Sequence, residues 1–130
     1  MEAGSIAQDM AFLDREFVEV VRRHFHVCPG HDLDGAARLD ALFSQGPLRE
    51  IAQADFRNVS VMLAAWVGET VRALAGGGRW SLDEQLGPCI IEVPGVPGAW
   101  RVLSRAEKRI RGSEAEVLLP FVARAVKLRS

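Results

Sequence analysis

The chain has 130 residues, of which 48% are hydrophobic, and this suits one compact domain that buries about two-thirds of its unfolded surface. Sixteen basic and 17 acidic residues give a formal net charge of −1, so no overall field marks the chain for nucleic acid or an anionic membrane. No apolar run approaches the roughly 20 residues of a membrane span, and the first residues lack the pattern of a secretory signal. We therefore expect a single cytoplasmic domain over residues 1–130, in which Cys28 and Cys89 are too few for a disulfide framework.

The sequence predicts a helical N-terminal part over residues 1–57. It begins with an amphipathic helix of about five to six turns that ends near Cys28, because Pro29 cannot continue it. The apolar stripe of this helix comprises Ile6, Met10, Leu13, Phe17, Val20, Val21 and Phe25. Its polar face comprises Asp9, Asp14, Arg15, Glu19, Arg22 and Arg23. Asp34 is the predicted N-cap of a shorter helix that ends at Gly46, and residues 47–57 form a linker or a helical turn.

Residues 58–112 begin with the stretch around which we expect the rest of the chain to pack. Apolar and small residues recur there at three- and four-residue steps, namely Val59, Met62, Leu63, Trp66, Thr70, Ala73 and Leu74. This spacing predicts a helix with one buried face, capped by Asn58 and closed by the glycines of residues 76–78. We expect Leu63, Trp66 and Trp80 to lie in the core.

After the glycines, the apolar residues alternate as they do in strands. We predict strands at Trp80–Asp83, Cys89–Val93 and Trp100–Leu103, with a turn at 94–98, where two prolines and two glycines interrupt any ladder. Short connections favour an antiparallel meander. The predicted fold class is α+β, with helices packed on one face of a small antiparallel three-stranded sheet.

Two serines that precede a glutamate by three residues form predicted capping boxes, namely Ser104 with Glu107 and Ser113 with Glu116. They predict a short helix before Gly112 and a C-terminal helix over residues 113–130. Pro120 falls inside the second helix, which therefore either kinks or begins again near Leu119.

Several of these motifs resemble a group of uncharacterised bacterial domains. The group shares a Gly-Glu pair after an aromatic or small residue, a Gly-x-Trp strand and a Lys-Arg-Ile helix. In this chain the corresponding residues are Trp66–Glu69, Arg79–Trp80 and Lys108–Ile110, and Leu33–Phe43 is similar to the helix before the Gly-Glu pair. The resemblance covers about residues 31–120. It implies an α+β fold and assigns no activity, because the group is one of unknown function.

The segment His24–Asp34 collects potential metal ligands. It holds every histidine of the chain and one of the two cysteines, and the candidate ligands are His24, His26, Cys28, His31 and Asp32. Against a metal site, the spacing matches no closed zinc pattern, and cationic histidines also suit a helix C-terminus. We favour the structural interpretation and keep a small metal-dependent enzyme or hydrolase that uses this segment as the alternative.

Glu69 follows the small residue Gly68 on the central helix, so we expect its stem to be enclosed. An enclosed carboxylate needs a partner, and we predict a structural ion pair with Arg109 or Lys108. Arg109 is preferred, because its planar guanidinium can hold both carboxylate oxygens. The alternative is that Glu69 serves as a general acid or base.

Five bases stand within 11 residues, namely Arg101, Arg105, Lys108, Arg109 and Arg111. They favour a solvated helix face, and the alternative is a nucleic-acid or anion binder that uses residues 101–111. The sequence contains no established catalytic signature and no cofactor fingerprint. We therefore expect a non-enzymatic protein-interaction or scaffolding module that forms a homodimer and needs no cofactor.

Overall fold

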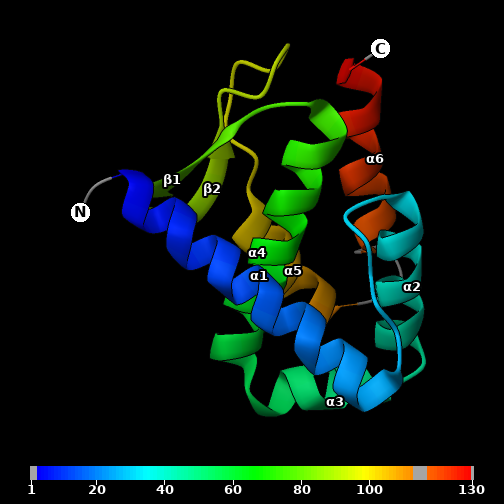
Figure 1. The fold of residues 1–130 in the computed structure, drawn as a ribbon. Helices are drawn as coiled ribbons and strands as arrows, with labels where there is room; N and C mark the ends of the chain where they lie inside the picture. The colour runs from blue at the N-terminus through cyan, green and yellow to red at the C-terminus, as the bar shows by residue number, and fades with distance from the viewer. Residues whose placement is uncertain (1–2, 113–116, 130) are drawn as a thin grey trace.

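The computed structural model describes the backbone of residues 3–112 and 117–129, and its fold class is α+β, as predicted. These residues form six helices and one two-stranded antiparallel hairpin (Figure 1). The elements are α1 (Ala3–Phe25), α2 (Leu33–Ser44), α3 (Pro47–Ala54), α4 (Phe56–Ala75), β1 (Arg79–Asp83), β2 (Gly87–Ile91), α5 (Val102–Arg111) and α6 (Leu118–Arg129). Within these residues no helix combines the length and the low charge needed to cross a membrane.

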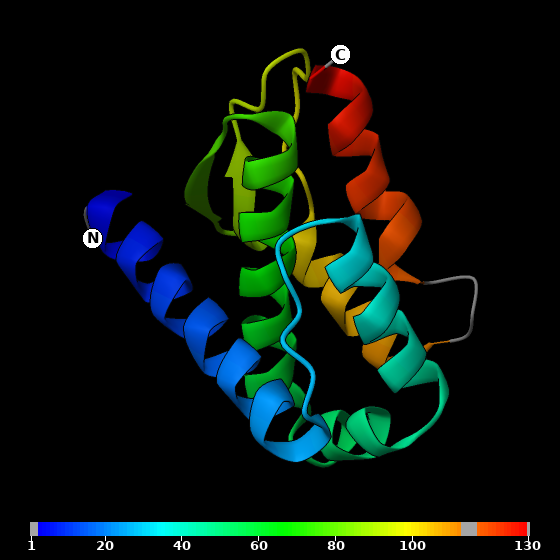
Figure 2. The same cartoon turned by 45° about the vertical axis from the view of Figure 1, so that its right-hand side comes forward.

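Helix α4 is the centre of the packing. It contacts α1 on one side and α5 and α6 on another, and α2 covers α6 (Figures 1 and 2). Its middle residues, Leu63–Val67, are buried all round, which agrees with an apolar helix that has neighbours on more than one flank. Leu63 and Trp66 are 0% exposed and Trp80 is 2% exposed, so the predicted core is confirmed.

The predicted closure of the central helix by the glycines of residues 76–78, which we call the glycine hinge, is also confirmed. Gly76 closes α4 in the left-handed conformation, with φ of 75°, and its N–H donates to the carbonyl of Arg72. Glycine adopts this conformation without the steric cost that a Cβ brings. The chain can therefore turn directly from α4 into β1 and fold Trp80 back over the helix.

The indole of Trp80 lies directly on Gly68. A Cβ built on Gly68 would stand only 2.1 Å from Trp80 Cη2, so this position has no room for a side chain. Gly68 weakens the helix locally, because glycine costs up to about 1 kcal/mol relative to alanine in a helix interior. The close contact between α4 and β1 is what requires the glycine.

Gly68→Ala should therefore destabilise the protein by about 1–3 kcal/mol, although alanine has the better helix propensity. Gly98→Ala is the matched control, because a Cβ there meets no atom within 4 Å, and we expect a change within about 0.5 kcal/mol. Urea denaturation of both variants measures the difference. A stabilised Gly68→Ala protein would contradict the Gly68–Trp80 contact.

The predicted third strand is wrong. Trp100 makes one isolated bridge to Ile90, with N···O distances of 3.3 and 2.8 Å, and α5 begins two residues later. Val102, Ala106 and Ile110 are buried at helical spacing, and this burial favours a helix over continued pairing with β2. The sheet is therefore a hairpin in which Trp80 pairs with Ile90, and α1, α4 and α5 contact it.

Three predicted helix starts also differ from the structure. Asp32, not Asp34, caps α2, because its Oδ1 accepts from the N–H of Gly35 at 2.7 Å. Helix α4 begins at Phe56, before the predicted cap Asn58, and α5 begins before Ser104. Residue propensity locates the start of a helix to within a few residues, but it does not decide which of two neighbouring polar residues is the N-cap.

Two segments whose structure the sequence did not decide are helical. Residues 47–54 form α3, with Pro47 in its first turn, where a missing N–H costs nothing. Helix α6 begins at Leu118, so Pro120 also lies in a first turn, and the second alternative for this helix is confirmed. The predicted cap of Ser113 with Glu116 lies outside the described residues.

Candidate functional site

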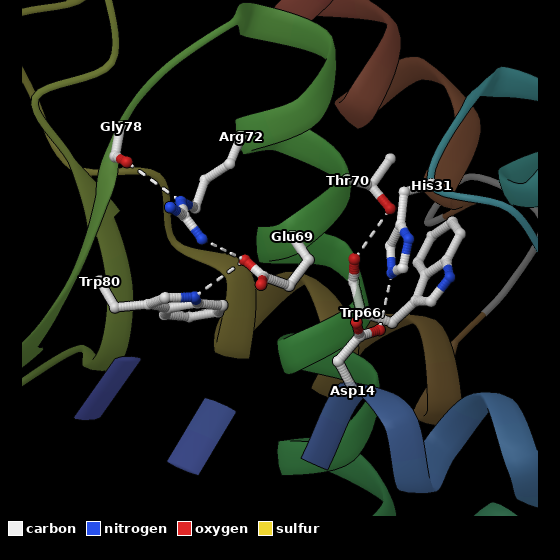
Figure 3. A network of polar contacts seen from close by, with 8 residues as sticks. All are labelled: Asp14, His31, Trp66, Glu69, Thr70, Arg72, Gly78 and Trp80. Atoms are coloured by element: carbon white, nitrogen blue, oxygen red, sulfur yellow. Dashed lines mark hydrogen bonds and ion pairs between the residues drawn. The ribbon is translucent and has the colours of Figure 1, made fainter. Parts of the chain in front are cut away.

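Glu69 joins α4 to the glycine hinge and to β1 (Figure 3). Its Oε2 accepts from Arg72 Nη1 at 2.7 Å and from Trp80 Nε1 at 3.2 Å. Arg72 in turn donates from Nε to the carbonyl of Gly78 at 3.0 Å. The Glu69 side chain is 20% exposed and fully engaged at Oε2, so the enclosed stem is confirmed, whereas the predicted pair with Arg109 or Lys108 is wrong.

Arg109 instead binds Asp40 across the core, which explains the failed prediction. Arg109 is 2% exposed, and its Nε donates to Asp40 Oδ1 at 3.0 Å, while its Nη2 donates to the Asp40 carbonyl and to Ser44 Oγ. The carboxylate of Asp40 also accepts from the N–H groups of Leu118 and Leu119, at 2.7 and 2.9 Å. Asp40 thus holds α5 and the start of α6 together, and Lys108 is left exposed on the surface.

A second polar pair lies beside Glu69 (Figure 3). His31 Nε2 lies 2.8 Å from Asp14 Oδ1, and the imidazole stacks on Trp66 with ring centroids 5.9 Å apart. Asp14 is buried, so its predicted place on the polar face of α1 is wrong. The sequence carried a signal for this, because Asp14 stands four residues after Met10 and three before Phe17, on the buried stripe.

Asp14, His31, Glu69, Arg72 and Ala73 line a shallow hollow of about 340 Å³. The hydrogen bond that His31 donates to Asp14 raises the pKa of His31, burial opposes this rise, and the charges of Asp14, Glu69 and Asp32 add to it. The lining offers acids, an imidazole and a guanidinium but no hydroxyl or thiol nucleophile. In this arrangement His31 can hold a proton, and its contacts with Asp14 of α1 and Trp66 of α4 fix the loop before α2.

A histidine whose pKa is raised by folding stabilises the folded state below its unfolded pKa near 6.5, and the stabilisation is lost as pH rises through the folded pKa. We therefore expect the free energy of unfolding to fall from about pH 6 toward pH 8. Denaturant titrations across this range should show a smaller fall in His31→Gln, whereas the exposed control His24→Gln should keep it. Identical profiles for the protein with and without His31 would contradict the Asp14–His31 pair.

The candidate metal ligands do not converge, and those with a hydrogen bond each have a different partner. His24 Nδ1 lies 2.9 Å from the carbonyl of Val20, His31 binds Asp14, and Asp32 caps α2. His26 has a φ of 58° at the end of α1, and Cys28 is an exposed free thiol. Within the part of the chain that the structure describes, no three His, Cys, Asp or Glu residues are grouped in a way that could hold a metal ion.

The bases of residues 101–111 divide between two faces of α5. Arg109 points into the core, and Arg111 lies over the ring of Phe56, with its Cζ 4.6 Å from the centroid. Arg101, Arg105 and Lys108 stand at four- and three-residue steps and therefore share the outer face. Together with Arg124 of α6 they line a hollow of about 260 Å³, which we call the basic hollow.

Two aromatic rings from different parts of the chain hold two of the three arginines of the basic hollow. Trp100 and Phe121 meet edge to face with centroids 5.3 Å apart. Arg124 lies over Trp100 and Arg105 over Phe121, each with its Cζ 5.1 Å from the ring centroid. The sequence could not place Phe121 and Arg124 here, because only the packing of α6 brings them to α5.

The basic hollow concentrates positive charge. Among the described residues, the side chains of Arg101, Lys108 and Arg124 make no hydrogen bond or ion pair. Lys108 and Arg124 are exposed, so their charges reach the solvent at the mouth of the hollow. Three cations that lack an ion pair among the described residues favour an anionic ligand.

No protein-family model matches the chain, and no curated protein or solved structure is significantly similar to it. The resemblance to uncharacterised bacterial domains therefore stays a prediction.

Proposed function

We propose that the protein is a non-enzymatic protein-interaction module that recognises an acidic segment of a partner protein in the basic hollow. The observation that carries this proposal is the set of cations around one small cavity, three of them without an ion pair among the described residues. A volume of about 260 Å³ is below the range of most small-molecule sites and suits one or two side chains. An acidic side chain would be complementary to it in both size and charge.

The geometry favours a protein ligand over a nucleic acid. Proteins that bind single strands present exposed aromatic rings on which bases stack. Here Trp100 is 4% exposed and Arg124 covers its face, so that ring offers no stacking surface. The net charge of −1 also gives the chain no overall positive field that would attract a phosphate backbone.

Self-association as a homodimer stays a prediction.

Two of the three arginines of the basic hollow are held in place by aromatic rings before a ligand arrives. A guanidinium stacked on a ring loses less side-chain freedom when its N–H groups bind a carboxylate, and this lowers the entropic cost of recognition. Arg105 and Arg124 are held in this way by Phe121 and Trp100. Lys108 adds a mobile point charge at the rim, which should act mainly on the association rate.

Binding of a fluorescent oligo-glutamate peptide, followed by anisotropy at low salt, tests the proposal. We expect Lys108→Glu/Arg124→Glu to weaken binding at least about tenfold, because both changes place repulsion at the mouth of the hollow. Arg57→Glu with Arg38→Glu is the matched control, since both arginines are exposed and neither lines the hollow. An oligo-glutamine peptide should not bind.

Equal losses in the two double variants would show that peptide binding reflects total charge and would refute the proposal. A single-stranded RNA that binds more tightly than the peptide, and loses affinity in the Lys108/Arg124 variant, would assign the basic hollow to nucleic acid instead. Thermal denaturation of each variant shows that the fold is intact before affinities are compared.

A further inference from the structure

A second hollow lies next to the basic hollow, on the side of the β-hairpin turn. It has a volume of about 500 Å³, and two acids line it, Glu84 in the turn and Glu107 on α5, against the single base Arg101. Gln85 and Leu103 add an amide and an apolar wall. We call it the acidic hollow. Arg101 and Ser104 line both hollows, so the two form one continuous surface across the beginning of α5.

The turn that forms one wall of the acidic hollow is well held. Asp83 Oδ1 accepts from the N–H groups of Gln85 and Leu86, at 2.8 and 2.9 Å, and these bonds lower the pKa of Asp83. Gly87 follows with φ of 70° and packs against α5, where an added Cβ would stand 3.0 Å from Leu103 Cδ2. The wall therefore keeps its shape without a ligand.

The acids of this second hollow lack internal partners. Within the described residues, neither Glu84 nor Glu107 makes a side-chain hydrogen bond or an ion pair. Lys108 follows Glu107 directly, yet the two side chains project from α5 in directions about 100° apart, so they line different hollows. Opposite charges are thus kept side by side on one surface without neutralising each other.

We infer that the two hollows bind one extended segment of a partner protein, with an acidic side chain in the basic hollow and a basic side chain in the acidic hollow. The inference rests on the proposed function and adds the sequence character of the ligand. The segment would cross α5 at Arg101 and Ser104. Ser104 makes no side-chain hydrogen bond among the described residues, and its hydroxyl can donate to or accept from the backbone of such a segment.

This arrangement also provides specificity against purely acidic ligands. A segment with acids at both ends would meet repulsion from Glu84 and Glu107 in the acidic hollow, and a nucleic-acid strand would meet the same repulsion. A segment with one acid and one base gains at both ends, because the second contact forms at the high effective concentration set by the first. Charge order in the partner, and not its net charge, would then decide binding.

Three sets of synthetic peptides test the inference by fluorescence anisotropy. One carries two glutamates at one end, another carries two lysines at one end, and the third carries both pairs joined by a glycine-serine spacer of about two to six residues. We expect the best spacer of the third set to bind the protein about tenfold more tightly than the glutamate peptide. Reversal of the chain direction of that peptide should weaken binding, since a built groove distinguishes the two directions.

Variants then assign each end of the peptide to a hollow. In Glu84→Lys/Glu107→Lys, the two-charge peptide should lose its tenfold advantage, while the glutamate peptide binds at least as well as before. In Lys108→Glu/Arg124→Glu, both peptides should bind weakly. The control is Glu16→Lys/Glu50→Lys, which makes the same change of charge at exposed positions outside both hollows.

The possible failures are distinguishable. If the glutamate peptide binds in the basic hollow but the lysine pair adds nothing at any spacer length, the inference is wrong and the proposed function stands. If neither the glutamate peptide nor the two-charge peptide binds, both are wrong. If the control variant abolishes the advantage as fully as Glu84→Lys/Glu107→Lys, the gain comes from total charge and the inference is wrong.

Discussion

Asp40→Ala should lower the free energy of unfolding by about 3–5 kcal/mol, because it leaves the buried guanidinium of Arg109 without its counter-charge. The same change removes the acceptor of the N–H groups of Leu118 and Leu119, so α6 also loses its N-terminal cap. Equilibrium denaturation in urea measures the loss. In the double variant Asp40→Ala/Arg109→Ala the losses should be less than additive, since the two residues share one interaction.

Asp34→Ala provides the control for this experiment on the same helix. Asp34 pairs with Arg38 at 2.7 Å, but both side chains are exposed, and an exposed pair of this kind contributes less than about 1 kcal/mol. We expect a small change in stability for Asp34→Ala. A loss below about 1 kcal/mol for Asp40→Ala, or strictly additive losses with Arg109→Ala, would contradict the role that we assign to the Asp40–Arg109 pair.

Trp66→Ala should lower the free energy of unfolding by about 3–5 kcal/mol, as expected for the truncation of a large aromatic side chain that is 0% exposed. The change would also remove the ring on which His31 stacks, so the loop before α2 should become more accessible. Denaturation gives the energy, and faster amide exchange at residues 27–32 gives the local effect.

Leu82→Ala is the matched control, because Leu82 is a large apolar side chain that is 57% exposed. We expect a change within about 0.5 kcal/mol for Leu82→Ala. If Trp66→Ala cost no more than Leu82→Ala, the central position of α4 in the core would be refuted.

The features that the sequence predicted correctly are those that depend on local pattern. The stripe from Met10 to Val21 and the all-round apolar character of Leu63–Val67 identified the two longest helices, because periodicity reports directly which face is buried. Gly76 identified the end of α4 for an equally local reason, since few other residues tolerate the left-handed conformation. Pro120 left two alternatives for the last helix, a kink or a new start near Leu119, and only the structure decides for the start at Leu118.

The failed predictions depended on contacts between distant parts of the chain. Trp100 is a residue type common in strands. It makes only one bridge to β2, because the chain after it buries its apolar residues as helix α5. Arg109 pairs with Asp40, which lies 69 positions away in the sequence. Glu69 pairs with Arg72, which lies three positions away on the same helix. Asp40 did carry a usable signal, because it stands four residues after Ala36 and three before Phe43, on the inward face of α2.

The candidate site shows the same division. The cluster of bases at residues 101–111 was visible in the sequence, yet its partition into a buried arginine and a surface group was not. The sequence also did not show that Phe121 and Arg124 of α6 lie beside these bases, or that Glu84 of the hairpin turn approaches them. The proposed binding surface is assembled from three separate segments, so it leaves no continuous sequence motif to recognise.

The attachment of α6 to α2 through Asp40 has a consequence for the order of folding. The N–H groups of Leu118 and Leu119 reach a carboxylate that lies 78 and 79 positions earlier, and Leu118, Val122 and Ala125 fill the core beside α4 and α2. Closing so long a loop is slow compared with forming the contacts within α1 or α4. During synthesis, the apolar surface of α2 and α4 that α6 covers therefore stays unburied until α6 has left the exit tunnel. Until then, a chaperone can bind that surface.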